Sequence, residues 1–301
     1  MSTTTSRRTR PRLAASPMAY AYVPLTLAPL EQLAQAFADL HDIGFTAVRS
    51  DVPQELPLDD YAHWLDTYDL SPATGIFAAT FDGEEELAHV LERARRTAAQ
   101  HTELGLDRVM LLADPVPARR ARPAVGADFD AARLDRVVEE IGTVARTLAA
   151  EGLRPLLHPR VSGLVETERE VRAVLDTLGP DVIGFGPDTG HLRWAGMDPV
   201  AMVTRYAERV GAVHLSDVYG DYAQPTRRGR GKSYDELVAT CRVWAEPGSG
   251  VVDLNGVLRA LPASFDGDLV VEIERASIFS VYEAYRTAHE WAAQAPVPVG
   301  V

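Results

Sequence analysis

The sequence predicts a (β/α)8 barrel, an α/β fold in which parallel strands alternate with helices around a closed cylinder. Apolar segments of strand length alternate along the chain with segments of helical periodicity. The chain has 301 residues, enough for the about 250 residues that such barrels typically occupy. No Gly-x-Gly-x-x-Gly motif follows the first strand, and phosphate-loop and nucleophile-elbow motifs are also absent. These absences disfavour the open dinucleotide-binding sheet.

Eight apolar runs of strand length define the predicted staves of the barrel. In chain order they cover residues 19–23, 45–49, 74–79, 108–113, 154–158, 182–186, 212–215 and 268–274. In the last run, alternation places Glu272 and Glu274 on one side of the strand. If that side faces the interior, both acids lie close to any metal held there.

The segments between the strands carry helical periodicity and helix-boundary residues. The predicted helices cover 30–42, 58–68, 84–101, 130–150, a segment from 167 onward, 199–210, 252–261 and 281–294. Gly44 and Gly152 end two of them, as glycine commonly does. Three acids open the helix at 84, where the helix dipole favours negative charge. Thr167 and Glu170 match a capping box, so a structural role is expected for Glu170.

Composition limits the classes of partner. The formal net charge of −13 leaves no general basic surface for nucleic acid. No apolar run approaches the roughly 20 residues of a membrane helix. Cys241 is the only cysteine, which excludes an intrachain disulfide and a cysteine-rich zinc site. We therefore expect a cytoplasmic protein with a small-molecule partner, and the formation of a homo-oligomer is left open.

The expected organisation is one domain with a tail and one long loop. Residues 1–16 are predicted to be a disordered N-terminal tail, because Ser, Thr and Arg dominate its start and no apolar targeting segment follows. Residues 17–301 form the single barrel domain. A long loop at about 217–250 is expected to act as a lid or contact surface. Its basic run at 227–232 is interpreted as solvated, with recognition of an anionic substrate group as the alternative. The arginines at 119, 120 and 122 are treated in the same way, with a phosphate clamp as their alternative.

Two strands end in clusters that combine a carboxylate with an imidazole. Asp188 and His191 follow one strand, and His214 ends the next, two residues before Asp217. The carboxyl ends of barrel strands form the catalytic face, and Asp and His together suit a divalent metal. A helix cap for each Asp and a structural role for each His are the plainer interpretations. Recurrence at two strand ends favours the metal.

At these positions the sequence resembles a known family, the xylose-isomerase-like sugar-phosphate isomerase/epimerase superfamily, and within it the inosose dehydratase group. The resemblance covers most of the chain from the second strand onward and is strongest from Leu157 to Glu274. The motifs that carry it are Asp188-Thr189-Gly190-His191, Gly196-Met197-Asp198-Pro199, His214-Leu215-Ser216-Asp217, Gly248-Ser249-Gly250-Val251-Val252-Asp253 and Val270-Val271-Glu272.

The resemblance implies a metal site. It makes Asp188, His214 and Glu272 ligands, with His158 in the fourth place, where the epimerases usually carry Glu. Manganese is the first choice of metal, and cobalt, magnesium, iron and zinc are the alternatives. Ser216 stands where relatives often carry Lys. The candidate catalytic residues are His158, Glu272 and His191, where His191 acts as a base or orients a ligand. The candidate substrate-binding residues are Glu166, Arg193, Asp217 and Glu274.

The expected activity follows from the same comparison. A metal that binds a carbonyl stabilises the enediolate formed when the neighbouring carbon loses a proton. His158 in place of Glu disfavours the two-carboxylate epimerase scheme and favours a lyase. The expected function is therefore a dehydratase that eliminates a β-oxygen from a keto-sugar, keto-inositol or keto-glycoside. The alternatives are a sugar isomerase or epimerase, a non-catalytic barrel subunit of a hetero-complex, and, last, a nuclease of the same barrel superfamily.

Overall fold

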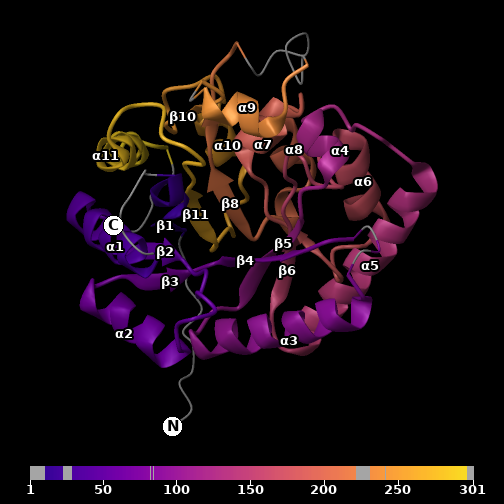
Figure 1. Cartoon of the computed structure of the whole chain (residues 1–301), viewed down its shortest axis with the longest axis horizontal. Helices are drawn as coiled ribbons and strands as arrows, with labels where there is room; N and C mark the ends of the chain where they lie inside the picture. The colour runs from indigo at the N-terminus through magenta and orange to yellow at the C-terminus, as the bar shows by residue number, and fades with distance from the viewer. Residues whose placement is uncertain are drawn as a thin grey trace.

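Parallel strands form a closed barrel in the computed structural model, which describes residues 11–22, 29–81, 83, 85–221, 231–240 and 242–296 (Figure 1). One sheet has the strand order β3-β2-β1-β11-β8, and a second has the order β4-β5-β6-β7. Only Thr74 separates β3 from β4, and two isolated parallel bridges join β7 to β8. The two sheets thus close into the predicted barrel. The barrel strands are β1 Arg12–Ala15, β2 Ala47–Arg49, β3 Ser71–Ala73, β4 Gly75–Ala79, β5 Arg108–Ala113, β6 Arg154–Leu157, β7 Gly184–Phe185, β8 Ala212–Leu215 and β11 Asp268–Val271.

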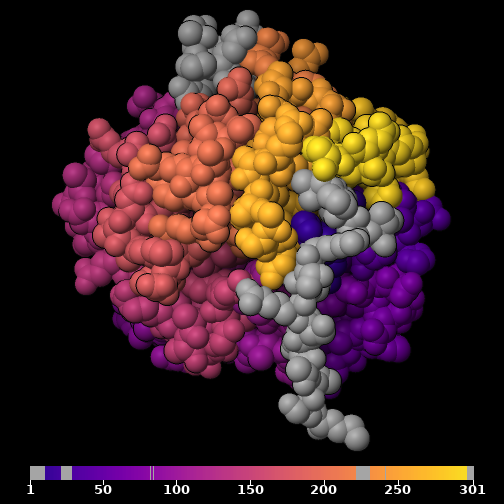
Figure 2. All heavy atoms as spheres, turned by 180° about the vertical axis from the view of Figure 1, so that it is seen from behind, coloured from indigo at the N-terminus to yellow at the C-terminus, as the bar shows by residue number. Residues whose placement is uncertain are grey.

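Helices surround the strands (Figure 1), and the longer ones, α1, α3, α5, α6 and α11, bury apolar side chains on one face. Their bounds are α1 Pro29–Ile43, α2 Leu58–Thr67, α3 Leu87–Glu103, α4 Pro117–Ala121, α5 Ala131–Ala150, α6 Glu168–Thr177, α7 Thr189–Trp194, α8 Pro199–Arg205, α9 Tyr234–Ala239, α10 Leu254–Ala260 and α11 Val281–Ala292, with 3-10 turns η1 Met18–Tyr22 and η2 Ala207–Arg209. The capping box predicted at Thr167 opens α6. Helices α1 and α11 pack together, so the first and last helices of the chain are neighbours (Figure 2). No helix within these described ranges has both the length and the apolar character needed to cross a membrane.

The first strand lies earlier in the chain than predicted. The run at 19–23 was expected to be a strand, but residues 18–22 form η1. Strand β1 is Arg12–Ala15, so the barrel begins inside the segment 1–16 that was predicted to be a tail. The aromatic run has the stronger strand propensity, but Ala14 and Ala15 are completely buried between β2 and β11, where packing decides the outcome. Residues 1–10 lie outside the described part of the chain.

The segment predicted as a loop at 217–250 contains regular structure. Strand β9, Asp217–Val218, pairs antiparallel with β10, Trp244–Ala245, and α9 lies between them in the chain. Residues 222–230 and Cys241 lie outside the described part of the chain, so most of the predicted basic run does as well. The described ends of this segment therefore form a small two-stranded antiparallel sheet.

Buried ion pairs lie at the amino ends of the strands, opposite the predicted catalytic face. Asp268 is completely buried, accepts two hydrogen bonds from Thr74, at 2.8 and 2.7 Å, and pairs with Arg12 at 3.0 Å. Arg108 is 3% exposed and pairs with Asp266. Because catalytic residues of such barrels lie at the opposite, carboxyl end of the strands, these pairs are expected to serve stability rather than catalysis.

Close packing fixes the position of Gly75 at the start of β4. A Cβ atom there would lie 2.1 Å from the carbonyl oxygen of Ser50 and 2.6 Å from Nε2 of His101. His101 is buried, and its Nδ1 donates to the carbonyl of Thr97 at 2.9 Å. The backbone carbonyl of Ser50, directly after β2, and the imidazole of His101 in α3 therefore leave room only for glycine at this position.

We expect Gly75→Ala to destabilise the fold by about 1–3 kcal/mol or more, because the added methyl group must displace backbone atoms. Urea denaturation of the variant and the wild type measures the difference. Gly179→Ala is the matched control, since no atom lies within 4 Å of its added Cβ, and its effect should stay within about 0.5 kcal/mol. Equal stability of the two variants would contradict this packing.

The burial of His101 also predicts a pH dependence. Burial lowers the pKa of His101 below its usual value, so the unfolded chain binds the proton more readily than the folded one. The contribution of a neutral His101 to stability is then complete above the unfolded pKa, near 6.5, and is lost as the pH falls below it. We expect His101→Gln to lose less stability than the wild type between pH 7 and pH 5 in urea denaturation. His63→Gln, at an exposed position of α2, should keep the wild-type dependence.

Candidate metal centre and active site

Four side chains predicted as metal ligands lie at the carboxyl ends of barrel strands. His158 follows β6, Asp188 follows β7, His214 lies in β8 and Glu272 follows β11. Each is at most 4% exposed. Polar groups rarely occupy such buried positions unless they are paired or bind an ion.

Three of these side chains form a group that can hold a metal ion. His158, Asp188 and His214 each offer a ligand atom, and these atoms lie within 4.8 Å of one another. The rings of the two histidines meet edge to face, with centroids 4.6 Å apart. A parallel bridge between the backbones of Asp188 and His214 fixes the spacing of that pair. Glu272 is not a member of the group, but its Oε2 lies 3.2 Å from Nδ1 of His214.

Two buried atoms in this group have lone pairs that could bind a cation. Oδ1 of Asp188 accepts hydrogen bonds from the backbone N–H of His191, at 2.9 Å, and from the hydroxyl of Ser216. Oδ2 of Asp188 and Nε2 of His214 are buried and have no hydrogen-bond partner in the described structure. Leaving such atoms unpaired costs about 1–3 kcal/mol each, which a bound cation would offset.

His158 is prepared to be a neutral ligand. Its Nδ1 lies 2.8 Å from the carbonyl oxygen of Gly186, which can only accept, so Nδ1 carries the proton and Nε2 has a lone pair. Burial lowers the pKa of His158 to about 4. The ring therefore stays neutral at physiological pH, as metal binding requires. Two imidazoles and a carboxylate suit zinc, manganese, cobalt or iron.

Glu272 is held from both sides by residues of neighbouring strands. Its Oε1 accepts a hydrogen bond from the hydroxyl of Ser16 at 3.1 Å, and its Oε2 pairs with Nη1 of Arg49 at 2.7 Å. Burial raises the pKa of Glu272 to about 7, although Arg49 opposes the shift. Glu272 thus adjoins the metal group as a buried carboxylate with its own cation.

His191 and Glu274 form a second network beside the first. Nδ1 of His191 accepts a hydrogen bond from the backbone N–H of Val161 at 3.2 Å, and Nε2 lies 3.1 Å from Oε1 of Glu274. The other oxygen of Glu274 pairs with Arg160 at 3.0 Å. Burial opposes ionisation of Glu274, but Arg160 and His191 outweigh it and lower its pKa to about 2. Both nitrogens of His191 are therefore in use, which leaves it no free position as a base.

Two of the predicted substrate-binding carboxylates hold loops in place. Glu166 accepts hydrogen bonds from the backbone N–H groups of Ser162, Ala124 and Gly126, at 2.8 to 3.0 Å. Asp217 accepts from four N–H groups, those of Val218, Gly248, Gly250 and Val252. These bonds use both carboxylate oxygens of each residue, so both residues have a structural role, and their contact with substrate stays a prediction. The loop-forming role of Glu166 agrees with its helix-entry interpretation.

Arg193 stays a prediction. It lies in α7 with a half-buried side chain, and its buried Nε has no hydrogen-bond partner in the described structure. Among the described residues, no hydrogen bond or ion pair joins it to the metal group. Glu274 contacts His191 at 3.1 Å and Arg160 at 3.0 Å, and its contact with substrate also stays a prediction.

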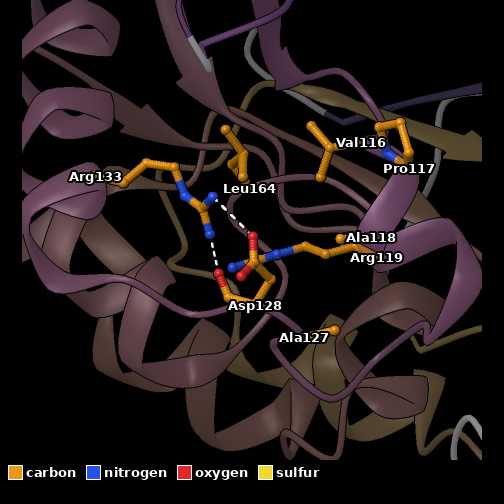
Figure 3. A pocket seen from close by; sticks show the side chains of 8 residues that line it. All are labelled: Val116, Pro117, Ala118, Arg119, Ala127, Asp128, Arg133 and Leu164. Carbon is orange, nitrogen blue, oxygen red and sulfur yellow. Dashed lines mark hydrogen bonds and ion pairs between the residues drawn. The ribbon is translucent and has the colours of Figure 1, made fainter.

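Of the arginines considered as a phosphate clamp, Arg119 lines a separate cavity. A cavity of about 240 Å³ lies between α4, the start of α5 and the loop before α6 (Figure 3). Arg119 points across it and is paired with Glu170 at 2.6 Å, and Arg133 is paired with Asp128 at 3.0 Å. Arg120 pairs with Asp235. Carboxylates therefore neutralise the guanidinium groups of Arg119 and Arg120, which disfavours a phosphate clamp built on these two.

Sequence reasoning missed the arginines that surround the site. Arg49 is the last residue of β2 and is 5% exposed, and Arg160 follows His158 by two residues. A charged residue at the end of an apolar strand is the signal that would have identified Arg49. Nothing in the local sequence indicates that Arg160 reaches Glu274, because 114 positions separate the two.

The chain belongs to the xylose isomerase-like TIM barrel family, whose sequence model matches residues 37–295. It is 28% identical over 143 residues to an inosose dehydratase of Geobacillus kaustophilus, which covers 47% of this chain and 46% of that protein. It is 33% identical over 133 residues to the rhizopine catabolism protein MocC of Rhizobium meliloti, which covers 44% of this chain and 40% of that protein. The match thus spans less than half the length of these relatives.

Solved structures share the fold. The probable 3-DHS dehydratase AsbF of Bacillus anthracis superposes with a TM-score of 0.69 at 12% identity, over 94% of this chain and 98% of that one. The IolI protein, solved with a zinc atom, superposes with a TM-score of 0.67 at 17% identity, over 94% and 97% of the two chains. At these identities the likeness concerns the fold alone.

The unpaired atoms predict how metal binding responds to mutation. We expect Asp188→Ala and His214→Ala each to lower the affinity for a divalent metal by about 100-fold or more. Loss of a residue that only orients a ligand already lowers the affinity about 10–100-fold. Metal analysis of the purified proteins, followed by titration of the metal-free forms with Mn²⁺ and Zn²⁺, measures the effect. Asp198→Ala, which removes an exposed carboxylate that only caps α8, is the control. Retention of metal by both site variants would refute the assignment.

Proposed function

We propose that this protein is a divalent-metal-dependent dehydratase that acts on a keto-cyclitol or keto-sugar. The observation that carries the proposal is the group of His158, Asp188 and His214, with two buried atoms that lack a partner. The similarity to inosose dehydratases supports a lyase that acts on a cyclitol ketone. Manganese is our first choice of metal, and the zinc in the related IolI structure supports a site of this kind.

The metal would be held by His158, Asp188 and His214. Once bound there, a divalent cation polarises a carbonyl oxygen and stabilises the negative charge that develops as the adjacent carbon loses its proton. The ring of His158 is fixed by Gly186, and Asp188 is fixed by Ser216 and by the N-terminus of α7. These contacts hold the donor atoms in place before the substrate arrives, which favours catalysis.

Among the three predicted acid/base residues, Glu272 fits the role of base best. His158 is better suited as a ligand, and both nitrogens of His191 are engaged. Oε2 of Glu272 is held by Arg49, whereas Oε1 has a hydroxyl partner and can accept a proton. Removal of the proton and departure of the β-hydroxyl group as water leave a carbon–carbon double bond. This elimination needs no oxidant or reductant.

Arg160 supports the departure of the oxygen. Its side chain is 16% exposed and pairs with Glu274 at 3.0 Å, and Arg160 lies two residues beyond His158 in the chain. A positive charge beside the site stabilises negative charge on a leaving oxygen.

The alternatives receive less support. An epimerase needs a second acid/base group on the opposite face of the carbon. His158 is a weak candidate for that group, because burial lowers its pKa to about 4. A non-catalytic subunit would have no need of buried, unpaired ligand atoms, which are costly to maintain.

The test is incubation of the metal-loaded protein with keto-inositols and keto-sugars in deuterated water, followed by NMR. We expect deuterium at the carbon next to the carbonyl together with a dehydrated product. Glu272→Gln should abolish exchange, because the amide cannot accept the proton. Exchange with an epimer as the product would favour the isomerase, and the absence of exchange across these substrates would contradict the enolisation chemistry.

A further inference from the structure

Arg49 bridges two carboxylates at the edge of the metal group. Its Nε donates to Oδ2 of Asp51 at 2.7 Å, and its Nη1 donates to Oε2 of Glu272 at 2.7 Å. Arg49 is 5% exposed, whereas the side chain of Asp51 is 38% exposed. The planar fork of arginine can engage two acids at once in a fixed geometry, which lysine cannot do.

Glu272, which Arg49 holds in place, in turn contacts His214. The oxygen that Arg49 holds, Oε2, is also the one that lies 3.2 Å from Nδ1 of His214. The other oxygen is held by Ser16 at the end of β1. Because β2, β1, β11 and β8 are consecutive in the sheet, this series of contacts crosses four adjacent strands at their carboxyl ends.

A carboxylate beside Nδ1 determines which nitrogen of His214 is available. Nδ1 lies 3.2 Å from Oε2 of Glu272 and 3.8 Å from Oδ2 of Asp188, so Glu272 is its nearer acid. With the proton on Nδ1 and shared with Glu272, the lone pair lies on Nε2, which has no hydrogen-bond partner in the described structure. Carboxylates that orient a ligating histidine in this way fix the ring and strengthen its bond to the metal.

We propose that Arg49 is a positioning residue of the metal centre and acts through Glu272 on His214. Asp51 pairs with the guanidinium of Arg49 on the solvent side, and Glu272 pairs with it on the buried side. The series of contacts therefore runs from the surface to the interior of the barrel. The inference rests on the proposed function only in that the group of His158, Asp188 and His214 binds a divalent metal.

A purely structural role for Arg49 is the competing explanation, and Arg108 provides the control for it. Arg108 is also a buried, acid-paired arginine, but it lies at the amino end of the barrel, on β5. Arg108→Met should therefore disturb the fold in the same way as Arg49→Met without reaching the metal group.

The experiment measures the Mn²⁺ and Zn²⁺ affinities of the metal-free proteins by competition with a chelator, alongside urea denaturation. We expect Arg49→Met to weaken binding about 10–100-fold, Asp51→Asn to weaken it less, and Arg108→Met to leave it unchanged even where stability falls. If Arg49→Met does not fold, Arg49→Lys takes its place and should also bind more weakly, since lysine cannot hold both acids.

A second measurement does not depend on the metal. Nitrogen NMR shifts of the His214 ring in the metal-free protein should show the proton on Nδ1 in the wild type and a mixture of tautomers in Arg49→Met.

The possible outcomes separate the two proposals. If the wild type binds metal and Arg49→Met binds it equally well or more tightly, or if Arg108→Met weakens binding as much as Arg49→Met, the role of Arg49 is refuted while the metal site stands. If the wild type binds neither metal, the proposed function fails.

Discussion

The candidate metal centre depends on the burial of lone pairs that have no hydrogen-bond donor in the described structure. Oδ2 of Asp188 and Nε2 of His214 lie inside the barrel without a donor, while every other polar atom of these two side chains has a neighbour that fixes it. A fold retains such atoms only where another gain compensates their cost. The backbone bridge between the two residues fixes the spacing of their backbones, and each residue is 1% exposed. The surrounding arginines and carboxylates pair with one another, as Arg49 does with Glu272 and Arg160 with Glu274. This pairing lowers the cost of keeping so many charged groups inside the protein.

The alternation of strands and helices was sufficient to predict the barrel and the strand ends that carry His158, Asp188 and His214. That inference succeeds because parallel strands bring their carboxyl ends to one face, whatever the sequence between them. It failed at β1, where Arg-Leu-Ala-Ala carries little strand signal and burial between two strands decides the structure. The more aromatic run that followed had the stronger pattern but became a 3-10 turn.

The partners of the site residues could not be predicted. Arg49 meets Glu272 across 223 positions of sequence, and Arg160 meets Glu274 across 114. These contacts arise only once the barrel closes and β1 lies between β2 and β11. The same limit explains Glu166 and Asp217, whose types and positions match substrate contacts but whose oxygens face backbone N–H groups. A carboxylate at a strand end therefore indicates the catalytic face, and only its neighbours tell whether it serves the substrate or the loop.

The four N–H groups that converge on Asp217 join the two ends of one excursion of the chain. Asp217 lies where the chain leaves the barrel after β8, and Gly248, Gly250 and Val252 lie where it returns. Both ends of the excursion are thus fastened to a single carboxylate, so the segment leaves and rejoins the barrel at one point, and the cost of closing it grows only slowly with its length. Its described middle part also contacts the barrel, through Tyr234 with Glu274 and through Asp235 with Arg120. A change in the length of the segment would therefore be absorbed first by these side-chain contacts and only afterwards by the backbone of β8 and β11.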